Sequence, residues 1–147
     1  MADEDFPFGL GYRRDMPWSE YLMRLDDHEH GRRLPDGWVP STFRVADVAG
    51  VIVGRASIRH MLNPFLERIG GHIGYAVLPE HRRKGYATEI LRQSLDVIRA
   101  LGVDRVLVTC DVTNTASRRT IERCGGIKAE TYDGPDVVVP KLRFFIG

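Results

Sequence analysis

Residues 72–88 read HIGYAVLPEHRRKGYAT, and this stretch decides the fold. The first seven residues predict a strand over 72–78, and Pro79 ends it because proline cannot donate a hydrogen bond to a sheet ladder. Over 85–101, apolar residues recur at gaps of three and four, which predicts a helix with one buried stripe. A basic turn, Arg82-Arg83-Lys84, therefore lies between a buried strand and an amphipathic helix.

This junction has the chemistry of an anion site. The first turn of a helix leaves backbone N–H groups without partners, and the helix dipole adds partial positive charge there. Gly85 lets the backbone approach an anion closely, and arginine can contact a phosphate with two donors. The Walker and dinucleotide-binding glycine patterns are both absent. The plainer alternative is a solvated charged turn, but its position between strand and helix favours the anion site.

Hydropathy and turn signals predict the elements on either side of this junction. In chain order these are a helix from Pro17 that fades over 28–33, strands over 42–47 and 51–61, a loop over 62–71, a strand over 105–112, a helix over 114–124, and strands over 127–132 and 141–146. The strand, helix and strand within 72–112 form a βαβ unit, whose two strands are expected to be parallel. The predicted fold is α/β: a mixed, twisted sheet, antiparallel in its first half, with one parallel pair and helices on both faces.

Composition narrows the class of protein. The formal net charge is +1, which favours neither a nucleic-acid partner nor a membrane partner. No apolar run approaches the roughly 20 residues of a membrane span, and the two cysteines lack metal or redox spacing. The acidic N-terminus has no signal-peptide pattern, so a cytoplasmic location is expected. Residues 1–16 are interpreted as a loosely ordered segment, and residues 17–147 as a single domain.

Arg82-x-x-Gly85-x-Ala87 resembles the [Q/R]-x-x-G-x-[G/A] signature of GNAT (GCN5-related N-acetyltransferase) proteins. The resemblance extends over residues 42–146, including the helix start at 114–117 and its end at 122–125. Residues 71–75, with 58–60 upstream, resemble a bacterial subgroup of predicted acetyltransferases. It implies a GNAT-like sheet with splayed central strands and a single acyl-CoA N-acyltransferase domain over 17–147. The implied activity is transfer of an acetyl group from acetyl-CoA to a primary amine by direct attack, without a metal.

The resemblance also implies a set of cofactor-binding residues. Strand backbone would pair with the pantetheine arm, the basic turn would hold the pyrophosphate, and the second helix start would lie beside the thioester. These residues are, respectively, Tyr75, Ala76 and Val77; Arg82, Arg83, Lys84, Gly85, Tyr86, Ala87 and Thr88; and Asn114 and Ser117.

The catalytic candidates are His72, His60 and Ser117. Amine attack needs a base that works near pH 7, and histidine has a suitable unperturbed pKa. The plainer interpretation of His72 is a histidine that bonds a loop carbonyl or packs on the sheet. Ile121 occupies the position where many family members carry a tyrosine that protonates the leaving thiolate. Ser117, Cys124 or water could supply that proton instead.

The sequence says less about the amine that accepts the acetyl group and about binding partners. A small-molecule or peptide amine is expected, and Trp18, Tyr21, Trp38 and Phe43 could border its pocket, with the polar cluster 26–30 as another candidate. A non-catalytic acyl-CoA-binding or sensor module is the main alternative, and a nucleic-acid-binding domain the second. The family's first strand has no counterpart, so residues 6–12 or another subunit could complete the edge. An exposed final strand could also pair across a homodimer.

Overall fold

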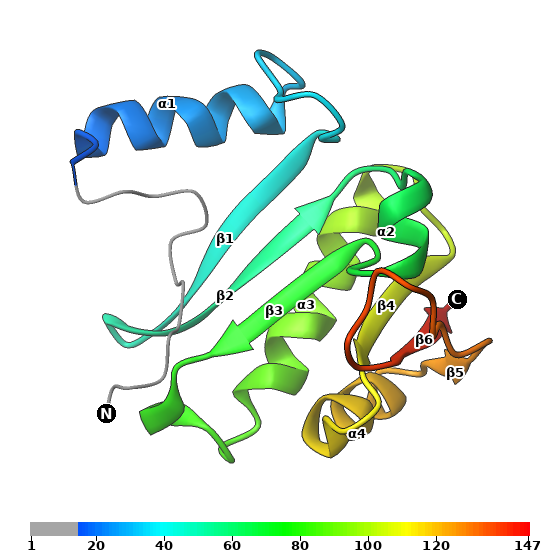
Figure 1. The fold of residues 1–147 in the computed structure, drawn as a ribbon. Helices are drawn as coiled ribbons and strands as arrows, with labels where there is room; N and C mark the ends of the chain where they lie inside the picture. The colour runs from blue at the N-terminus through cyan, green and yellow to red at the C-terminus, as the bar shows by residue number, and fades with distance from the viewer. Residues whose placement is uncertain (1–14) are drawn as a thin grey trace.

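The computed structural model describes residues 15–147 (Figure 1). Two expectations fall on residues outside this range: the loosely ordered start of the chain and the use of residues 6–12 to complete the sheet edge. Met16, at the boundary of the expected N-terminal segment, is buried with 4% of its surface exposed. No helix among the described residues is both long enough and apolar enough to cross a membrane.

Within residues 15–147, six strands form two three-stranded antiparallel sheets. The first sheet has the order β1 (Ser41–Val48), β2 (Val51–Arg59), β3 (Ile73–Val77), and the second has the order β4 (Val106–Asp111), β6 (Lys141–Ile146), β5 (Ile127–Lys128). The final strand therefore lies inside its sheet, which corrects the expectation of an exposed final strand that could pair across a dimer. The strand expected over 127–132 is also shorter, because beyond Lys128 only Tyr132 forms a bridge, to Lys141.

The two sheets meet at one point and then separate. The backbone N–H of His72 donates to the carbonyl of Leu107 (2.7 Å), and the N–H of Leu107 donates to His72 Nδ1 (2.9 Å). Beyond this junction no ladder joins β3 to β4 in residues 15–147, and Figure 1 shows the two strands diverging. The α/β fold with splayed central strands is thus confirmed, and the central pair touches only where it begins.

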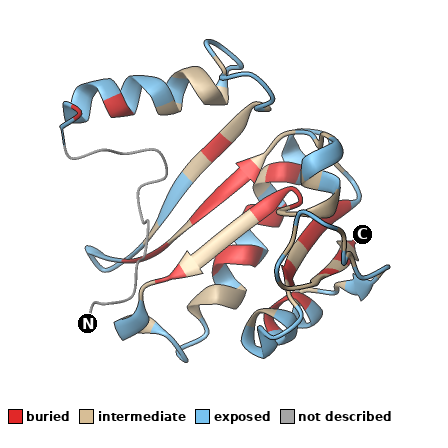
Figure 2. Ribbon diagram, in the orientation of Figure 1, coloured by how far each residue is buried: buried red, intermediate tan, exposed pale blue. Residues whose placement is uncertain are grey.

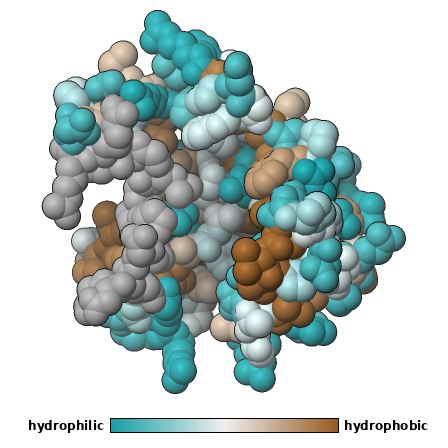
Figure 3. All heavy atoms as spheres, in the orientation of Figure 1, coloured by the Kyte–Doolittle hydropathy of each residue, from teal (hydrophilic) through white to brown (hydrophobic). Residues whose placement is uncertain are grey.

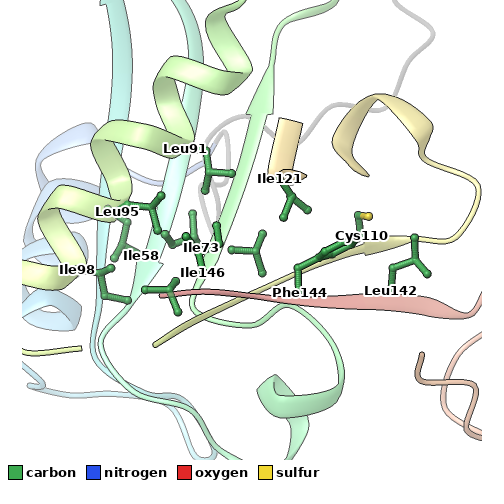
Figure 4. Packing of buried hydrophobic residues seen from close by; sticks show 12 residues of the cluster. Ile58, Ile73, Leu91, Leu95, Ile98, Cys110, Ile121, Leu142, Phe144 and Ile146 are labelled. Carbon is green, nitrogen blue, oxygen red and sulfur yellow. The ribbon is translucent and has the colours of Figure 1, made fainter. Parts of the chain in front are cut away.

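The main core lies where α3 (Tyr86–Ala100) covers the first sheet and reaches the second. Leu91, Leu95 and Ile98 lie along one stripe of α3 and are at most 3% exposed. Figure 4 shows them directed toward Ile58 and Ile73 of the sheet, with α4 and strand residues completing the cluster. Buried residues concentrate in these strands and helices (Figure 2), as a helix with one apolar stripe requires. The helix predicted over 85–101 is therefore present within one residue at each end.

In the described part of the chain, three further α-helices and a short 3-10 helix, η1 (Pro79–His81), complete the fold. α1 (Trp18–Glu29) packs beside the edge strand β1, and α4 (Thr115–Arg123) follows β4. α2 (Pro64–Arg68) lies in the segment expected to be a loop. Its sequence carries a start signal, since the side chain of Asn63 accepts a hydrogen bond from the Leu66 N–H (2.8 Å) and proline follows at the first helical position.

Candidate active site

The turn between β3 and α3 forms an open backbone cradle. Gly85 is the N-cap of α3 in the left-handed region (φ 83°), and no side chain of the described residues caps the helix. Arg83 is also left-handed (φ 64°), and such alternation turns successive N–H groups toward one point. The first bond of the helix runs from the Glu89 N–H to the Gly85 carbonyl (3.3 Å), so the N–H groups of residues 86–88 precede the helical ladder. A Cβ on Gly85 would meet no atom within 4 Å, which leaves the space above the cradle free.

Charge is concentrated at this cradle. Arg82, Arg83 and Lys84 are all exposed. The Nε of Arg82 donates to the carbonyl of Val77 (3.0 Å), which fixes the turn to the end of β3. The cradle therefore combines N–H groups, a helix dipole and three cationic side chains at the place where β3 leaves β4, a suitable arrangement for a phosphate group.

The separation of β3 from β4 leaves one edge of β3 without a strand partner among residues 15–147. β2 pairs with the other edge, so the polar backbone groups of Tyr75, Ala76 and Val77 that point away from β2 are available to an extended ligand.

The Tyr75 hydroxyl lies 2.8 Å from Ser117 Oγ on α4. Burial is the main cause that raises the pKa of Tyr75 to about 12, so its hydroxyl stays protonated. The Asn114 side chain accepts from the Ser117 N–H (3.1 Å) and caps α4.

His72 is buried at the junction of the two sheets. Its Nδ1 accepts the Leu107 N–H, so the neutral ring carries its proton on Nε2 and has no free lone pair. Burial is the largest cause that lowers the pKa of His72, and the nearby charge of Arg59 lowers it further. The structure thus gives His72 the role of joining the sheets. Its role as a base stays a prediction, and it would require this hydrogen bond to break.

His60 belongs to a different network. Thr42 Oγ1 donates to Glu29 (2.9 Å) and lies 2.8 Å from His60 Nε2. Since a hydroxyl has one hydrogen, His60 Nε2 must be the donor in the second contact. Burial lowers the pKa of His60. Side chains alternate along a strand, so His60 lies on the Ile58 side of the sheet.

Ile121, at the position where the resemblance predicted a tyrosine in many relatives, is part of the core. Ile121 is fully buried and packs with the α3 stripe. Cys124 lies at the end of α4, where its Sγ contacts the carbonyl of Thr88 (3.7 Å), and burial raises the pKa of its thiol. Ser117, with its partner Tyr75, is therefore the hydroxyl that the structure places between β3 and α4.

A cleft of about 1160 Å³ lies between α1, the loop that follows it, the first sheet and α2. Among the aromatic residues expected there, Tyr21, Trp38 and Phe43 line it and Trp18 is not among its lining residues. Of the polar cluster 26–30, Asp27 and His28 contribute to the wall. Figure 3 shows this side of the molecule, with hydrophilic residues over most of the surface and hydrophobic residues gathered in patches.

Sequence reasoning did not identify Arg59 as a functional residue, although it lines the same cleft. The available signal was an arginine at the end of a strand whose residues are mostly apolar. Asp26, Glu29 and His30 bring potential metal ligands together, but Arg32 Nη2 pairs with Asp26 at 2.6 Å.

Comparison with solved structures finds the same fold in several acetyltransferases. A mutant of the spermidine N-acetyltransferase SpeG from Vibrio cholerae is 18% identical, with a TM-score of 0.63, 88% of this chain covered and 75% of the other. The ribosomal-protein-alanine N-acetyltransferase from Brucella melitensis is 17% identical (TM-score 0.63; 86% and 75% covered). The yncA protein from Salmonella typhimurium, solved with acetyl-CoA, is 16% identical (TM-score 0.61; 87% and 71% covered).

Sequence comparison identifies the family of this chain but no individual relative among curated proteins. A search of curated protein sequences gave no significant match. A family model described as the acetyltransferase (GNAT) domain matches residues 7–127, most of the chain. The splayed sheets, the open cradle before α3 and this match lead to one conclusion: the chain belongs to the GNAT acetyltransferase family.

Proposed function

We propose that this protein binds acetyl-CoA and transfers its acetyl group to a primary amine of a small molecule or peptide. One observation carries the proposal: the uncapped start of α3, with left-handed Gly85 and three exposed cations, opens where β3 and β4 separate. The family match and the neighbour solved with acetyl-CoA support the same cofactor.

The residues present fit that cofactor. The N–H groups of Arg83 to Thr88 would hold the pyrophosphate, and the space above Gly85 is free for it. The unpaired edge of β3 at Tyr75 to Val77 would pair with the pantetheine arm as an added strand would. Asn114 and Ser117, at the start of α4, would lie beside the thioester.

The chain's side chains then account for proton movement at the sulfur. Acetyl-CoA supplies a thioester, at whose carbonyl carbon the amine nitrogen forms a bond while the carbon–sulfur bond breaks. Ser117 would donate its proton to the departing sulfur, the Tyr75 hydroxyl, 2.8 Å away, would replace that proton, and water would return a proton to Tyr75. The amine proton would go to water. In this proposal His72 is a positioning residue, because its lone pair is already used.

The experiment is calorimetric titration with acetyl-CoA, CoA and a plain adenine nucleotide. Wild-type protein should bind acetyl-CoA, whereas Gly85→Glu should abolish binding because the new carboxylate would occupy the phosphate space. Gly102→Glu is a matched control, since Gly102 follows the other end of α3, is also left-handed (φ 96°) and also faces open space. Unchanged affinity in Gly85→Glu would refute the assignment.

A non-catalytic acyl-CoA sensor remains the second candidate, and the core position of Ile121 favours it. Such a module would bind acetyl-CoA with the same dependence on Gly85. It would release no CoA when offered a broad panel of amines, whereas the transferase releases CoA in proportion to acetylated amine.

A further inference from the structure

Arg59 is held at the floor of the cleft beside the sheet junction. Its backbone N–H donates to the His72 carbonyl (2.6 Å), and its Nη1 donates to the carbonyls of Gly70 (2.9 Å) and Gly71 (3.3 Å). A Cβ on Gly74 would lie 3.4 Å from Nη1 and 3.5 Å from Nη2. The guanidinium group therefore lies over β3, next to the strand edge proposed to hold the pantetheine arm.

The positive charge of Arg59 has no ionic partner among residues 15–147, where no carboxylate lies within ion-pair distance. Burial lowers the pKa of Arg59, and the charge of Arg55 lowers it further. Arginine keeps its charge in proteins, so a largely buried guanidinium calls for an anion. Its two Nη1 bonds go to neutral carbonyls and leave donors on the cleft side.

Three acidic residues line the cleft, and none of them lies within ion-pair distance of Arg59: Asp36 is in the loop after α1, and the other two pair with other arginines. Glu20 pairs with Arg24 one helical turn away (3.3 Å). Asp27 pairs with Arg32 (3.0 Å) and Arg33 (3.5 Å) in the loop after α1. The floor is therefore cationic, and a ligand that brings its own carboxylate would neutralise it.

The remaining wall is suited to an apolar group. Tyr21 from α1, Trp38 from the following loop, Phe43 from β1 and Phe65 from α2 all line the cleft. Side chains of this kind bury apolar or aromatic groups well.

We infer that the acceptor is an amine that also carries a carboxylate, in the manner of an α-amino acid with an apolar or aromatic side chain, and that Arg59 binds the carboxylate. The inference rests on the proposed acetyl transfer and names its substrate class. A polyamine acceptor, by contrast, would bring further positive charge toward Arg59. Charge-assisted hydrogen bonds of Arg59 would also hold the amine beside the β3 edge.

The test compares pairs of acceptors that differ in the carboxylate: phenylalanine against phenethylamine, and leucine against 3-methylbutylamine. Each is titrated into the CoA-saturated protein and is also assayed with acetyl-CoA for CoA release. The wild type should favour the carboxylate member by about 10- to 100-fold in affinity and in kcat/KM, as expected for hydrogen bonds to a charged group. Arg59→Gln should raise KM for the amino acids and reduce the preference to about threefold or less, with little change for the plain amines.

Two control variants distinguish a loss of carboxylate binding from a loss of folding. Arg44→Gln removes an exposed arginine of the same sheet that pairs with Glu29 and is not among the residues that line the cleft, and it should keep the full preference. Arg59→Lys keeps a charge that can reach the Gly70 carbonyl, and it should retain part of the preference. Acetyl-CoA affinity should be unchanged in all three variants.

Equal binding of both members of each pair by the wild type, or no binding of either amino acid, would overturn the inference. Retention of the preference in Arg59→Gln would do the same. Failure of the wild type to bind acetyl-CoA would instead refute the proposed function, and the two failures are therefore distinguishable.

Discussion

His72→Asn is expected to make the stability of the protein less dependent on acidity. His72 is 6% exposed, and its Nδ1 accepts the Leu107 N–H. A proton added to Nδ1 would face that N–H, so the folded state resists protonation, and burial lowers the pKa of His72 for the same reason. Asparagine places an oxygen near the position of Nδ1, keeps the hydrogen bond and does not titrate.

The direction and magnitude of this pH dependence follow from the linkage between proton binding and folding. Because the folded-state pKa of His72 lies below its unfolded value of about 6.5, the unfolded chain binds the proton first. Its stabilising contribution is fully present above pH 6.5 and is lost as the pH falls from there toward the folded pKa. The loss has a limit of about 1.4 kcal/mol per pH unit for one proton. Between pH 6.5 and 5.5 the wild type should therefore lose up to about 1.4 kcal/mol more than His72→Asn.

Urea unfolding at pH 7.5, 6.5 and 5.5 measures this difference. The pKa values of His28 and His60 are also lowered, mainly by burial, but both histidines remain in the two proteins. Their effect cancels in the comparison, although the asparagine variant will be less stable at every pH because it fills less volume. The same pH dependence in both proteins would refute the placement of a neutral, hydrogen-bonded His72 at the junction.

Three further changes test the junction, the core and the chemistry. Gly71→Ala should destabilise the protein by more than about 1 kcal/mol in urea unfolding, because Gly71 has φ 60° and a Cβ would lie 2.4 Å from the Leu107 carbonyl oxygen; a neutral result would contradict that close approach. Phe144→Ala should cost about 3–5 kcal/mol and lower Tm by about 10 °C, whereas the half-buried neighbour Phe145 should tolerate alanine better; equal losses would show that β6 does not present alternate faces as described. Ser117→Ala should lower kcat for acetyl transfer about 100-fold or more with acetyl-CoA affinity unchanged, and an unchanged kcat would remove Ser117 from the proton path.

Elements with a strong local pattern could be predicted from the sequence. The α3 helix was predictable because its apolar stripe repeats over four turns and Pro79 ends the preceding strand. Gly85 was predictable as a position where the backbone can approach an anion, because a glycine there has no Cβ to intervene. Its left-handed φ of 83° is a feature that the structure adds. The hairpin of β1 and β2 was predictable for a similar reason, since its two strands are separated by two residues.

Features that depend on distant contacts could not be derived from local pattern. The side chain of His72 bonds a backbone group 35 positions later, and nothing near His72 specifies that partner. The final strand was expected to be exposed, but it lies between β4 and β5, because strand order is set by packing across the sheet. Arg59 was not predicted as a functional residue, because the role proposed for it depends on the absence of a paired carboxylate among residues 15–147, which the local sequence does not specify.

The segment 70–72 links the three parts of the proposed site. On the cleft side, the carbonyls of Gly70 and Gly71 accept Arg59 Nη1. On the opposite side, His72 ties β3 to β4 at Leu107 and so fixes where the strands begin to separate. Five residues later β3 ends at Val77, whose carbonyl holds Arg82 and thereby the phosphate cradle. A change that loosens the junction should therefore shift the acceptor arginine and the cofactor strand together, so Gly71→Ala should weaken acceptor selectivity as well as stability, whereas Phe144→Ala should reduce stability alone.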